Sequence, residues 1–214
     1  MRTTADPFAS GEKCTVELEL ERDIELLADT IDARRSWFRT WTTAQHTVVV
    51  GRAVDVQTEV SIESCRELDV PIVRRPSGGR SVVVGPGTVQ YTFTLPYGLS
   101  TELASISSSK RFCNRLLVNG LGDSRISTEE SGDLMIGDRK VGGLALKRAR
   151  DAMLLHGTLL VAADILLLSR LLLHPLREPA YRCGRPHADF LVNLGSIDTA
   201  LLERRVKSSL AGLS

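Results

Sequence analysis

Cysteine and aromatic residues are scarce in this chain, and neither sign of charge prevails. Its 214 residues include four Cys and 5% aromatic residues, and 27 Lys and Arg stand against 26 Asp and Glu. Cys14, Cys65, Cys113 and Cys183 are too few for a disulfide scaffold and form no CxxC pair or zinc-ligand cluster. We therefore expect a reducing compartment and no bound metal. The balanced charge also removes the usual electrostatic reason to expect nucleic acid as a partner.

Long uninterrupted apolar runs are missing as well. Residues 1–12 contain no apolar core of the kind that a secretion signal needs. The most lipid-like stretch, residues 153–176, contains His156, Asp164, Arg170 and His174. One charge at the centre of a membrane helix costs roughly 2.5–3.5 kcal/mol on insertion scales. We therefore expect buried elements there, no membrane association and a cytoplasmic protein.

Apolar periodicity predicts helices and strands in one domain. Apolar residues three or four apart predict helices at residues 19–35, 59–68, 103–121, 164–173 and 197–213. β-Branched and aromatic runs predict strands at residues 37–41, 47–50, 70–74, 82–84, 89–95, 133–136, 139–146 and 152–161. Gly85 and Gly87 predict a tight hairpin turn, and the Pro- and Arg-rich residues 174–193 predict a surface loop. Adjacent strands favour an α+β fold with a mixed, largely antiparallel sheet flanked by helices. Residues 1–18 are expected to form an arm and residues 19–214 a single domain.

The first segment that could carry chemistry is Arg-Arg-Pro-Ser-Gly-Gly-Arg at residues 74–80, directly after a predicted strand. Glycines after a serine allow a sharp turn whose N–H groups point outward and can bind an anion. Arginine side chains would add paired contacts to a phosphate or carboxylate. A plain β-turn with solvated arginines explains the same residues. Neither a phosphate-binding P-loop nor a dinucleotide fingerprint is present.

Two further segments place polar residues inside predicted strands. Lys140 follows a turn and precedes Gly142 and Gly143, so it could lie against a ligand and stabilise a phosphate or a carbonyl oxyanion. A solvated lysine on an edge strand is the alternative. His156 and Thr158 interrupt an apolar run, and buried polar groups need partners or a ligand. A core histidine bonded to a backbone carbonyl is the alternative there.

Taken in order, several segments resemble the lipoate–protein ligase A family, within the wider group of biotin and lipoate attachment enzymes. The resemblance covers about residues 21–193. It rests on WFRTW with TVVVGR, VPIVRRPSGGRSVV, SGDLMIGDRKVGGLALKR, LLHGTLLVAADI and YRCGRPHADFLVNL.

The resemblance implies a catalytic domain of the biotin and lipoate ligase type, with a narrow apolar tunnel for a medium-chain acyl group. Lipoate or octanoate would be activated by ATP, with Mg²⁺, to an acyl-adenylate. A lysine of a lipoyl carrier domain, from a 2-oxoacid dehydrogenase or a glycine cleavage H-like protein, would then attack it. Lys140 takes the place of the family's catalytic lysine. The implied substrate- and adenylate-binding residues are Arg74, Arg75, Ser77, Gly78, Gly79, Asp133, Gly142, Gly143, His156, Gly157 and Thr158.

The sequence also departs from the ligase pattern. Arg80 replaces the usual third glycine, and SVVVGPG lacks the histidine expected after that strand. The chain ends soon after Asn193, without the small C-terminal domain of many ligases, so a separate accessory subunit could be needed. One alternative is an octanoyltransferase that uses Cys183 as its nucleophile, although that thiol reads more simply as an incidental loop residue. Another is a protein that binds a lipoyl ligand or a carrier domain without turnover.

Overall fold

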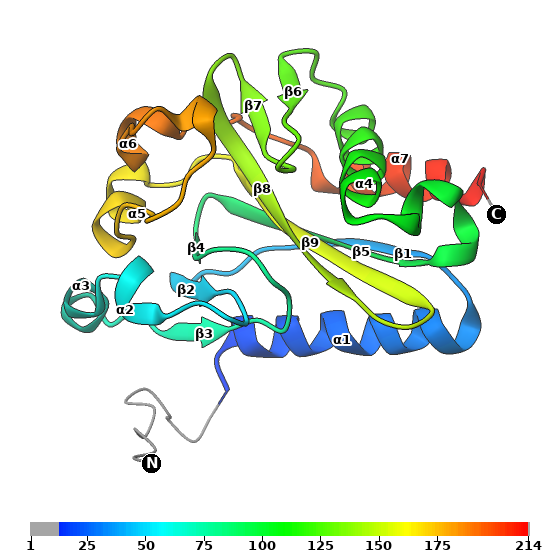
Figure 1. Cartoon of the computed structure of the whole chain (residues 1–214), viewed down its shortest axis with the longest axis horizontal. Coiled ribbons are helices and arrows are strands. Elements are labelled where there is room, and N and C mark those ends of the chain that lie inside the picture. Colours follow the sequence, from blue (N-terminus) through cyan, green and yellow to red (C-terminus); the bar gives the residue numbers. More distant parts are fainter. Residues whose placement is uncertain (1–12, 214) are drawn as a thin grey trace.

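The computed structural model describes residues 13–213, and two sheets form its framework (Figure 1). The larger sheet has the order β1-β5-β9-β8-β7-β6, and each neighbouring pair is antiparallel. Its strands are β1 (Trp37–Trp41), β5 (Thr88–Pro96), β6 (Ile126–Thr128), β7 (Leu134–Ile136), β8 (Arg139–Arg148) and β9 (Ala152–Leu160). The smaller sheet, β3-β2-β4, pairs β2 (Thr47–Val50) in parallel with β3 (Ile72–Arg74) and antiparallel with β4 (Val82–Val84).

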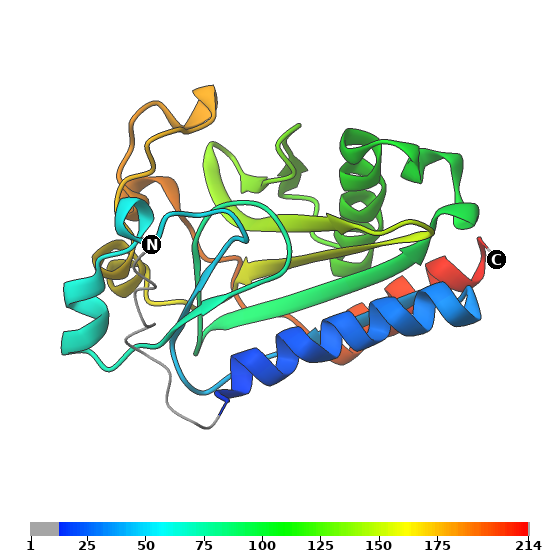
Figure 2. The same ribbon diagram turned by 60° about the horizontal axis from the view of Figure 1, so that its bottom comes forward.

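Helices cover both faces of the larger sheet (Figures 1 and 2). The long helix α1 (Thr15–Ala33) packs along β5 and β9 on one face, and α4 (Ile106–Leu121) and α7 (Thr199–Ala211) pack on the other. The small helices α2, α3, α5 and α6 gather at the end of the molecule that carries the smaller sheet (Figure 1). The α-helices are α1 (Thr15–Ala33), α2 (Val56–Glu59), α3 (Ile62–Glu67), α4 (Ile106–Leu121), α5 (Ile165–Leu171), α6 (His187–Phe190) and α7 (Thr199–Ala211). The 3₁₀ helices are η1 (Tyr97–Leu99), η2 (Thr101–Ala104) and η3 (Ala180–Arg182). The expected α+β fold is confirmed.

Strand β5 shows how alternation separates the core from the site. Tyr91 and Phe93 point into the main core, which α4 and α7 cover, and both are fully buried. Thr92 and Thr94 point to the opposite face, where their hydroxyl groups meet polar atoms of α1. Successive side chains of a strand face opposite sides of a sheet. One face of β5 is therefore apolar core, and the other is a polar face beneath α1.

The expected hairpin between residues 82–84 and 89–95 is wrong. Strand β4 pairs with β2 in the smaller sheet, whereas β5 pairs with β1 and β9 in the larger one. The turn at Gly85 and Gly87 thus transfers the chain between sheets. Gly87 has φ +78°, and a Cβ there would lie 2.1 Å from the carbonyl oxygen of Ala162. Glycine is required at position 87 because only glycine adopts a positive φ readily and leaves room for the Ala162 backbone.

The boundaries of several elements differ from the expected ones. Helix α1 begins at Thr15, inside the expected arm, and residues 1–12 lie outside the described part of the chain. The expected helix at residues 59–68 is two short helices, because Val60 forms a bridge to Leu172 and Ser61 caps α3. The short strand β6 and the helices η3 and α6 were not expected from the sequence. No helix in the described residues is long and apolar enough to span a membrane.

Candidate functional site

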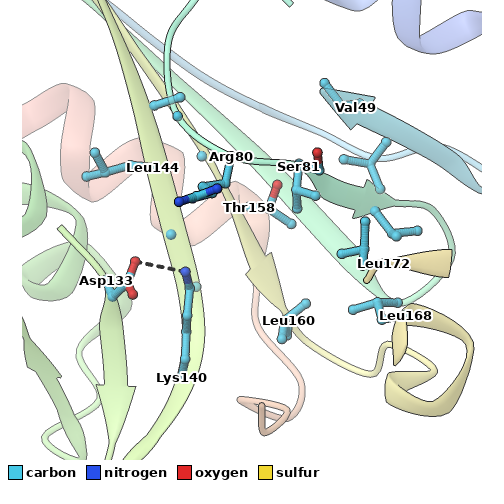
Figure 3. Close-up of a pocket in the computed structure, with 18 of the residues that line it drawn as sticks. Val49, Arg80, Ser81, Asp133, Lys140, Leu144, Thr158, Leu160, Leu168 and Leu172 are labelled. Carbon is cyan, nitrogen blue, oxygen red and sulfur yellow. Dashed lines mark ion pairs between the residues drawn. The ribbon is translucent and has the colours of Figure 1, made fainter. Parts of the chain in front are cut away.

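A cavity of about 510 Å³ opens between the two sheets. Valines of the smaller sheet and leucines of β9, α5 and the segment after α5 form its apolar walls, as the close-up in Figure 3 shows. Charged side chains enter it from β8, from the loop after β3 and from the segment before α6. The main apolar residues of the wall are Val49, Val82, Val84, Leu160, Leu168 and Leu172. An acyl chain and an anionic group could therefore occupy neighbouring parts of the same cavity.

Lys140 of β8 points into this cavity (Figure 3). Its Nζ lies 2.8 Å from Oδ1 of Asp133, and the Tyr181 hydroxyl donates a 2.7 Å hydrogen bond to the other carboxylate oxygen. A Cβ at Gly143 would lie only 2.9 Å from Nζ, so this glycine leaves the room that the ammonium group occupies. The lysine is held by one carboxylate while its side chain stays partly accessible. Lys140 is therefore not the edge-strand lysine of the alternative reading, because β8 lies between β9 and β7 and the side chain lines the cavity.

The glycines of β8 and β9 keep the backbones close behind Lys140. A Cβ at Gly157 would lie 2.3 Å from the carbonyl oxygen of Gly143 and 2.4 Å from the ring of Tyr91. A Cβ at Gly142 would lie 2.8 Å from the carbonyl oxygen of Thr158. Gly157 and Gly142 therefore act through packing. The side chain of Thr158 lies beside the cavity wall (Figure 3).

Arg74 and Arg75 are used to hold backbone. Arg74 Nη1 donates to the carbonyl oxygens of Gly51 at 2.7 Å and Val54 at 3.0 Å, and Arg74 does not line the cavity. Arg75 is 6% exposed, and its Nη2 donates to the carbonyl oxygens of Gly78 and Arg80, each at 2.7 Å. Burial lowers the pKa of Arg75 to about 10, although the charge of Glu59 opposes this effect. Arg75 therefore remains a cation at neutral pH and fixes the loop.

Ser77 belongs to a directed chain of hydrogen bonds beneath the cavity. Arg75 Nε donates to Ser77 Oγ at 3.0 Å, and Oγ lies 2.6 Å from Nε2 of His156. Nδ1 of His156 lies 2.9 Å from Oδ2 of Asp23, which is fully buried on α1. The carboxylate of Asp23 can only accept, so His156 donates to it from Nδ1, and in this tautomer Nε2 accepts from the Ser77 hydroxyl. Asp23 in turn accepts from Arg39 and Thr92. His156 is thus bonded to the side chains of Ser77 and Asp23, and not to a backbone carbonyl as the alternative reading expected.

The loop after Ser77 brings a second cation to the cavity. Gly79 has φ +89° and lines the cavity, whereas Gly78 does not line it, and a Cβ at Gly78 would meet nothing within 4 Å. Arg80 lines the cavity, and its Nη1 donates to Glu59 Oε1 at 2.5 Å. Sequence reasoning missed Glu59 and treated Arg80 only as a departure from a pattern. A charged residue in place of a glycine was the available signal.

Helices η3 and α6 close another side of the cavity. Arg182 is 5% exposed and His187 is partly buried, and both line the cavity. Burial first, and then the positive charges of Arg182, His174 and Lys140, lower the pKa of His187 to about 4. Burial is also the main cause of a raised pKa for Tyr181. Sequence reasoning missed these residues because it placed the segment in a surface loop.

Cys183, the possible nucleophile, is exposed and does not line the cavity. Its Sγ lies 3.2 Å from the carbonyl oxygen of Ala180, and its φ is +54°. In the part of the chain that the structure describes, no three or more His, Cys, Asp or Glu residues gather as a metal-binding group.

Similar proteins of known sequence are lipoate–protein ligases. The chain is 34% identical over 137 residues to lipoate-protein ligase A of Psychrobacter cryohalolentis, a match that covers 63% of this chain and 38% of the relative. It is 34% identical over 127 residues to lipoate-protein ligase A of Blochmanniella floridana, covering 56% of this chain and 35% of that relative. The chain thus spans less than two fifths of the length of these relatives.

Solved structures share the fold at low identity. The LipL1 protein of P. falciparum in complex with lipoate has a TM-score of 0.71 at 18% identity, covering 94% of this chain and 60% of that one. A lipoate-protein ligase A bound with ATP has a TM-score of 0.68 at 19% identity, and the match covers 93% of this chain and 81% of that one. The bi-partite lipoate protein ligase of Thermoplasma acidophilum has a TM-score of 0.68 at 19% identity, and the match covers 90% of this chain and 79% of that one. The sequence model of the lipoyl protein ligase A/B catalytic domain family matches residues 16–192. This chain therefore belongs to the lipoyl protein ligase A/B catalytic domain family.

Proposed function

We propose that this chain is a lipoate–protein ligase-type enzyme. It activates lipoate or octanoate with ATP to an acyl-adenylate and transfers the acyl group to a lysine of a lipoyl carrier domain. The observation that carries the proposal is Lys140, which is held by Asp133 at the border between the apolar wall and the charged part of the cavity. A medium-chain acid needs this combination of an apolar slot and a cation at its reacting end.

Lys140 stabilises negative charge in both steps of the proposed reaction. In the first step the carboxylate attacks the α-phosphate of ATP and pyrophosphate leaves. In the second step the carrier amine attacks the acyl carbonyl, the new C–N bond forms, the amine loses a proton and AMP leaves. Negative charge builds on the α-phosphate oxygens in the first step and on the acyl carbonyl oxygen in the second. These oxygens lie close together because the acyl carbon and the α-phosphorus share one bridging oxygen in the adenylate. A preorganised cation beside them lowers the barrier, and binding both reactants in one cavity supplies the positioning.

The loop at residues 74–80 supplies shape to this site. Arg75 and Ser77 fix the loop from below, and the space above Gly78 is open. We assign Gly78 and Gly79 to contact the adenylate through their backbones, because an anion can approach glycine closely. Arg74 supports the neighbouring loop at Gly51 and Val54. His156 and Thr158 form the polar floor of the acyl site.

ATP enters this site as its Mg²⁺ complex, because residues 13–213 contain no group of three or more His, Cys, Asp or Glu that could hold a metal ion by itself. Mg²⁺ is commonly bound by substrate phosphates and waters with one or two carboxylates. The carboxylates of Asp133 and Glu59, which line the cavity, already accept hydrogen bonds from neighbours. We propose that the reaction takes place in the cytoplasm. The carrier would be a lipoyl domain of a 2-oxoacid dehydrogenase or a glycine cleavage H-like protein. An accessory C-terminal-domain subunit is a further proposed partner, supported by the bi-partite ligase among the structural relatives.

Intact mass of a lipoyl carrier domain tests the proposal. One sample holds lipoate, ATP and Mg²⁺, and a second holds octanoyl carrier protein without ATP. We expect a mass gain of one lipoyl group in the first sample and none in the second.

A gain only in the second sample would replace the ligase with an octanoyltransferase, for which Cys183 is the candidate nucleophile. The exposed position of Cys183 outside the cavity disfavours that alternative. No gain in either sample calls for lipoyl-adenylate formation to be measured directly. If the adenylate forms, a partner subunit is missing; if none forms or binds, the ligase proposal fails. Binding without formation would indicate the non-catalytic alternative.

A further inference from the structure

The cavity contains an arginine where the family segment usually has glycine. Arg80 enters from the loop between β3 and β4, and Lys140 enters from β8. Figure 3 shows the charged ends of both side chains in the same cavity. The side chain of Arg80 is 44% exposed, so it can meet a ligand without rearrangement of the core.

One edge of the Arg80 guanidinium is fixed by a buried carboxylate. Nη1 of Arg80 donates to Oε1 of Glu59 at 2.5 Å, and Glu59 is 6% exposed. The backbone N–H and the hydroxyl of Ser81 both donate to Oε2 of Glu59 at 2.8 Å. Burial alone would raise the pKa of Glu59, but the hydrogen bonds from Arg80 and Ser81 outweigh it and lower this pKa. Glu59 is therefore an ionised anchor at neutral pH.

The backbone of Arg80 is fixed as well. Its carbonyl oxygen accepts the 2.7 Å hydrogen bond from the buried Arg75. Both ends of the residue are thus tethered before any ligand binds. A side chain held in this way loses little conformational entropy on binding, which preserves affinity.

The other edge of the guanidinium is available. Within residues 13–213, Nε and Nη2 of Arg80 have no hydrogen-bond acceptor. These two N–H groups are parallel and match the two oxygens of a carboxylate. Lys140 offers a point charge, whereas Arg80 offers this two-donor geometry. The valines of β4 adjoin Arg80 in the chain and line the apolar wall of the cavity.

We propose that Arg80 binds the carboxylate of the medium-chain acid through its Nε–Nη2 edge, and that Glu59 is the positioning residue that holds it there. The inference rests on the proposed function and deepens it. It separates two tasks: Arg80 recognises the carboxylate of the free acid, and Lys140 stabilises the charge that develops during reaction. The acid is thereby selected over uncharged derivatives with the same carbon chain.

Calorimetric binding of lipoate and of lipoamide, its neutral amide, tests the proposal. Wild type is compared with Arg80→Gln, Arg80→Lys and the control Arg150→Gln, which removes one charge from an exposed residue outside the cavity. Charge-assisted hydrogen bonds contribute enough for Arg80→Gln to weaken lipoate binding by about 10- to 100-fold. The affinity of Arg80→Gln for lipoamide should differ from that of wild type by no more than about twofold. The lipoate affinity of Arg80→Lys should lie between those of wild type and Arg80→Gln, and that of Arg150→Gln should match wild type.

The outcomes separate this inference from the proposed function. If wild type binds neither compound, the acyl site itself is refuted. If wild type binds lipoate and Arg80→Gln binds it equally well, Arg80 does not read the carboxylate while the acyl site stands. An equal loss for lipoate and lipoamide would mean that Arg80 only shapes the cavity, and would also overturn the inference.

A double-mutant cycle tests the role of Glu59. Glu59→Gln should weaken lipoate binding in the wild-type background and have little further effect in the Arg80→Gln background, because it acts through Arg80. Equal effects in both backgrounds would show a merely structural role. Thermal unfolding of each variant confirms that the fold is kept.

Discussion

The two glycine-containing segments, residues 74–79 and 140–143, use their cations differently. Arg74 and Arg75 are turned back onto the chain and donate to backbone carbonyl oxygens. Lys140 has a single carboxylate partner and stays partly accessible. An arginine has five N–H donors in a fixed fork and can satisfy several acceptors at once, whereas a lysine is a compact charge. The first segment therefore builds the wall of the site, and the second presents a charge to it.

Substitution of Lys140 should give the largest loss of activity. Lys140→Ala removes the preorganised cation, and comparable losses elsewhere cost about 10²–10³ in kcat. The fold should be retained, because Asp133 is the only ion-pair partner of the ammonium group within residues 13–213. Single-turnover transfer to a carrier domain and thermal unfolding are the measurements. Near-wild-type transfer would remove Lys140 from the proposed mechanism.

Substitution of Arg75 should have the opposite effect and lower the stability of the fold. Arg75→Ala leaves the carbonyl oxygens of Val49, Gly78 and Arg80 without their donor. Of these three, only the Val49 carbonyl lies in a fully buried hydrogen bond, and an unsatisfied buried group costs about 1–3 kcal/mol, so we expect a loss of about this size in unfolding free energy. Urea denaturation measures it, with Arg150→Gln as the matched loss of one exposed charge. A stable, inactive Arg75→Ala variant would instead place Arg75 among the ligand contacts and erase the contrast between the segments.

The sequence predicted the strands well where local chemistry decides them. Residues 37–41, 47–50 and 82–84 were expected as strands and are β1, β2 and β4. β-Branched and aromatic residues with glycine at the ends suffice for that. The partner of each strand could not be predicted in the same way. Strands β4 and β5 are neighbours in sequence but belong to different sheets, because pairing depends on the packing of distant segments.

Proximity in the site could be predicted where a residue and its glycines are close in sequence. Lys140 and Gly143 are such a case, and the structure brings them together in the cavity. Glu59 and Asp23 were missed because their partners, Arg80 and His156, are far away along the chain. A buried carboxylate within a predicted helix resembles any surface carboxylate in a single sequence. Only the fold shows which of them is dehydrated and paired.

Gly143→Ala sharpens the contrast by moving Lys140 without removing it. The added methyl group would lie 2.9 Å from Nζ and 3.3 Å from Asp133 Oδ1. The flexible end of the lysine can shift, so stability should change little. Displacement of a catalytic group by about 1 Å can cost up to about 10²-fold, and we expect a loss of about tenfold in kcat. The control is Gly98→Ala, at an exposed glycine outside the cavity whose methyl group would meet nothing within 4 Å. Its unfolding should match wild type, and unchanged kcat for Gly143→Ala would show that Nζ need not be held there.

His187 should make stability depend on pH. Burial and nearby cations lower its pKa from 6.5 to about 4 in the folded chain. The unfolded chain therefore binds a proton first, and this part of the stability is complete above about pH 6.5 and lost as the pH falls toward 4. Urea denaturation of wild type and His187→Gln at pH 7.5 and 5.0 tests this. The free energy of wild type should fall more steeply than that of the variant, and equal falls would refute the assignment.

Substitution of Cys183 should have the smallest effect. Cys183 is exposed and does not line the cavity, and its Sγ donates a weak hydrogen bond to the nearby carbonyl oxygen of Ala180. Cys183→Ser keeps the size of the side chain and replaces one weak donor by a hydroxyl group. Lipoate transfer and stability should both remain close to wild type, since surface substitutions usually stay within about 0.5 kcal/mol. Loss of octanoyl transfer in the same variant, with ATP absent, would instead make the segment before α6 the source of the nucleophile. The cation of Lys140 would then act on an acyl-enzyme rather than on an adenylate.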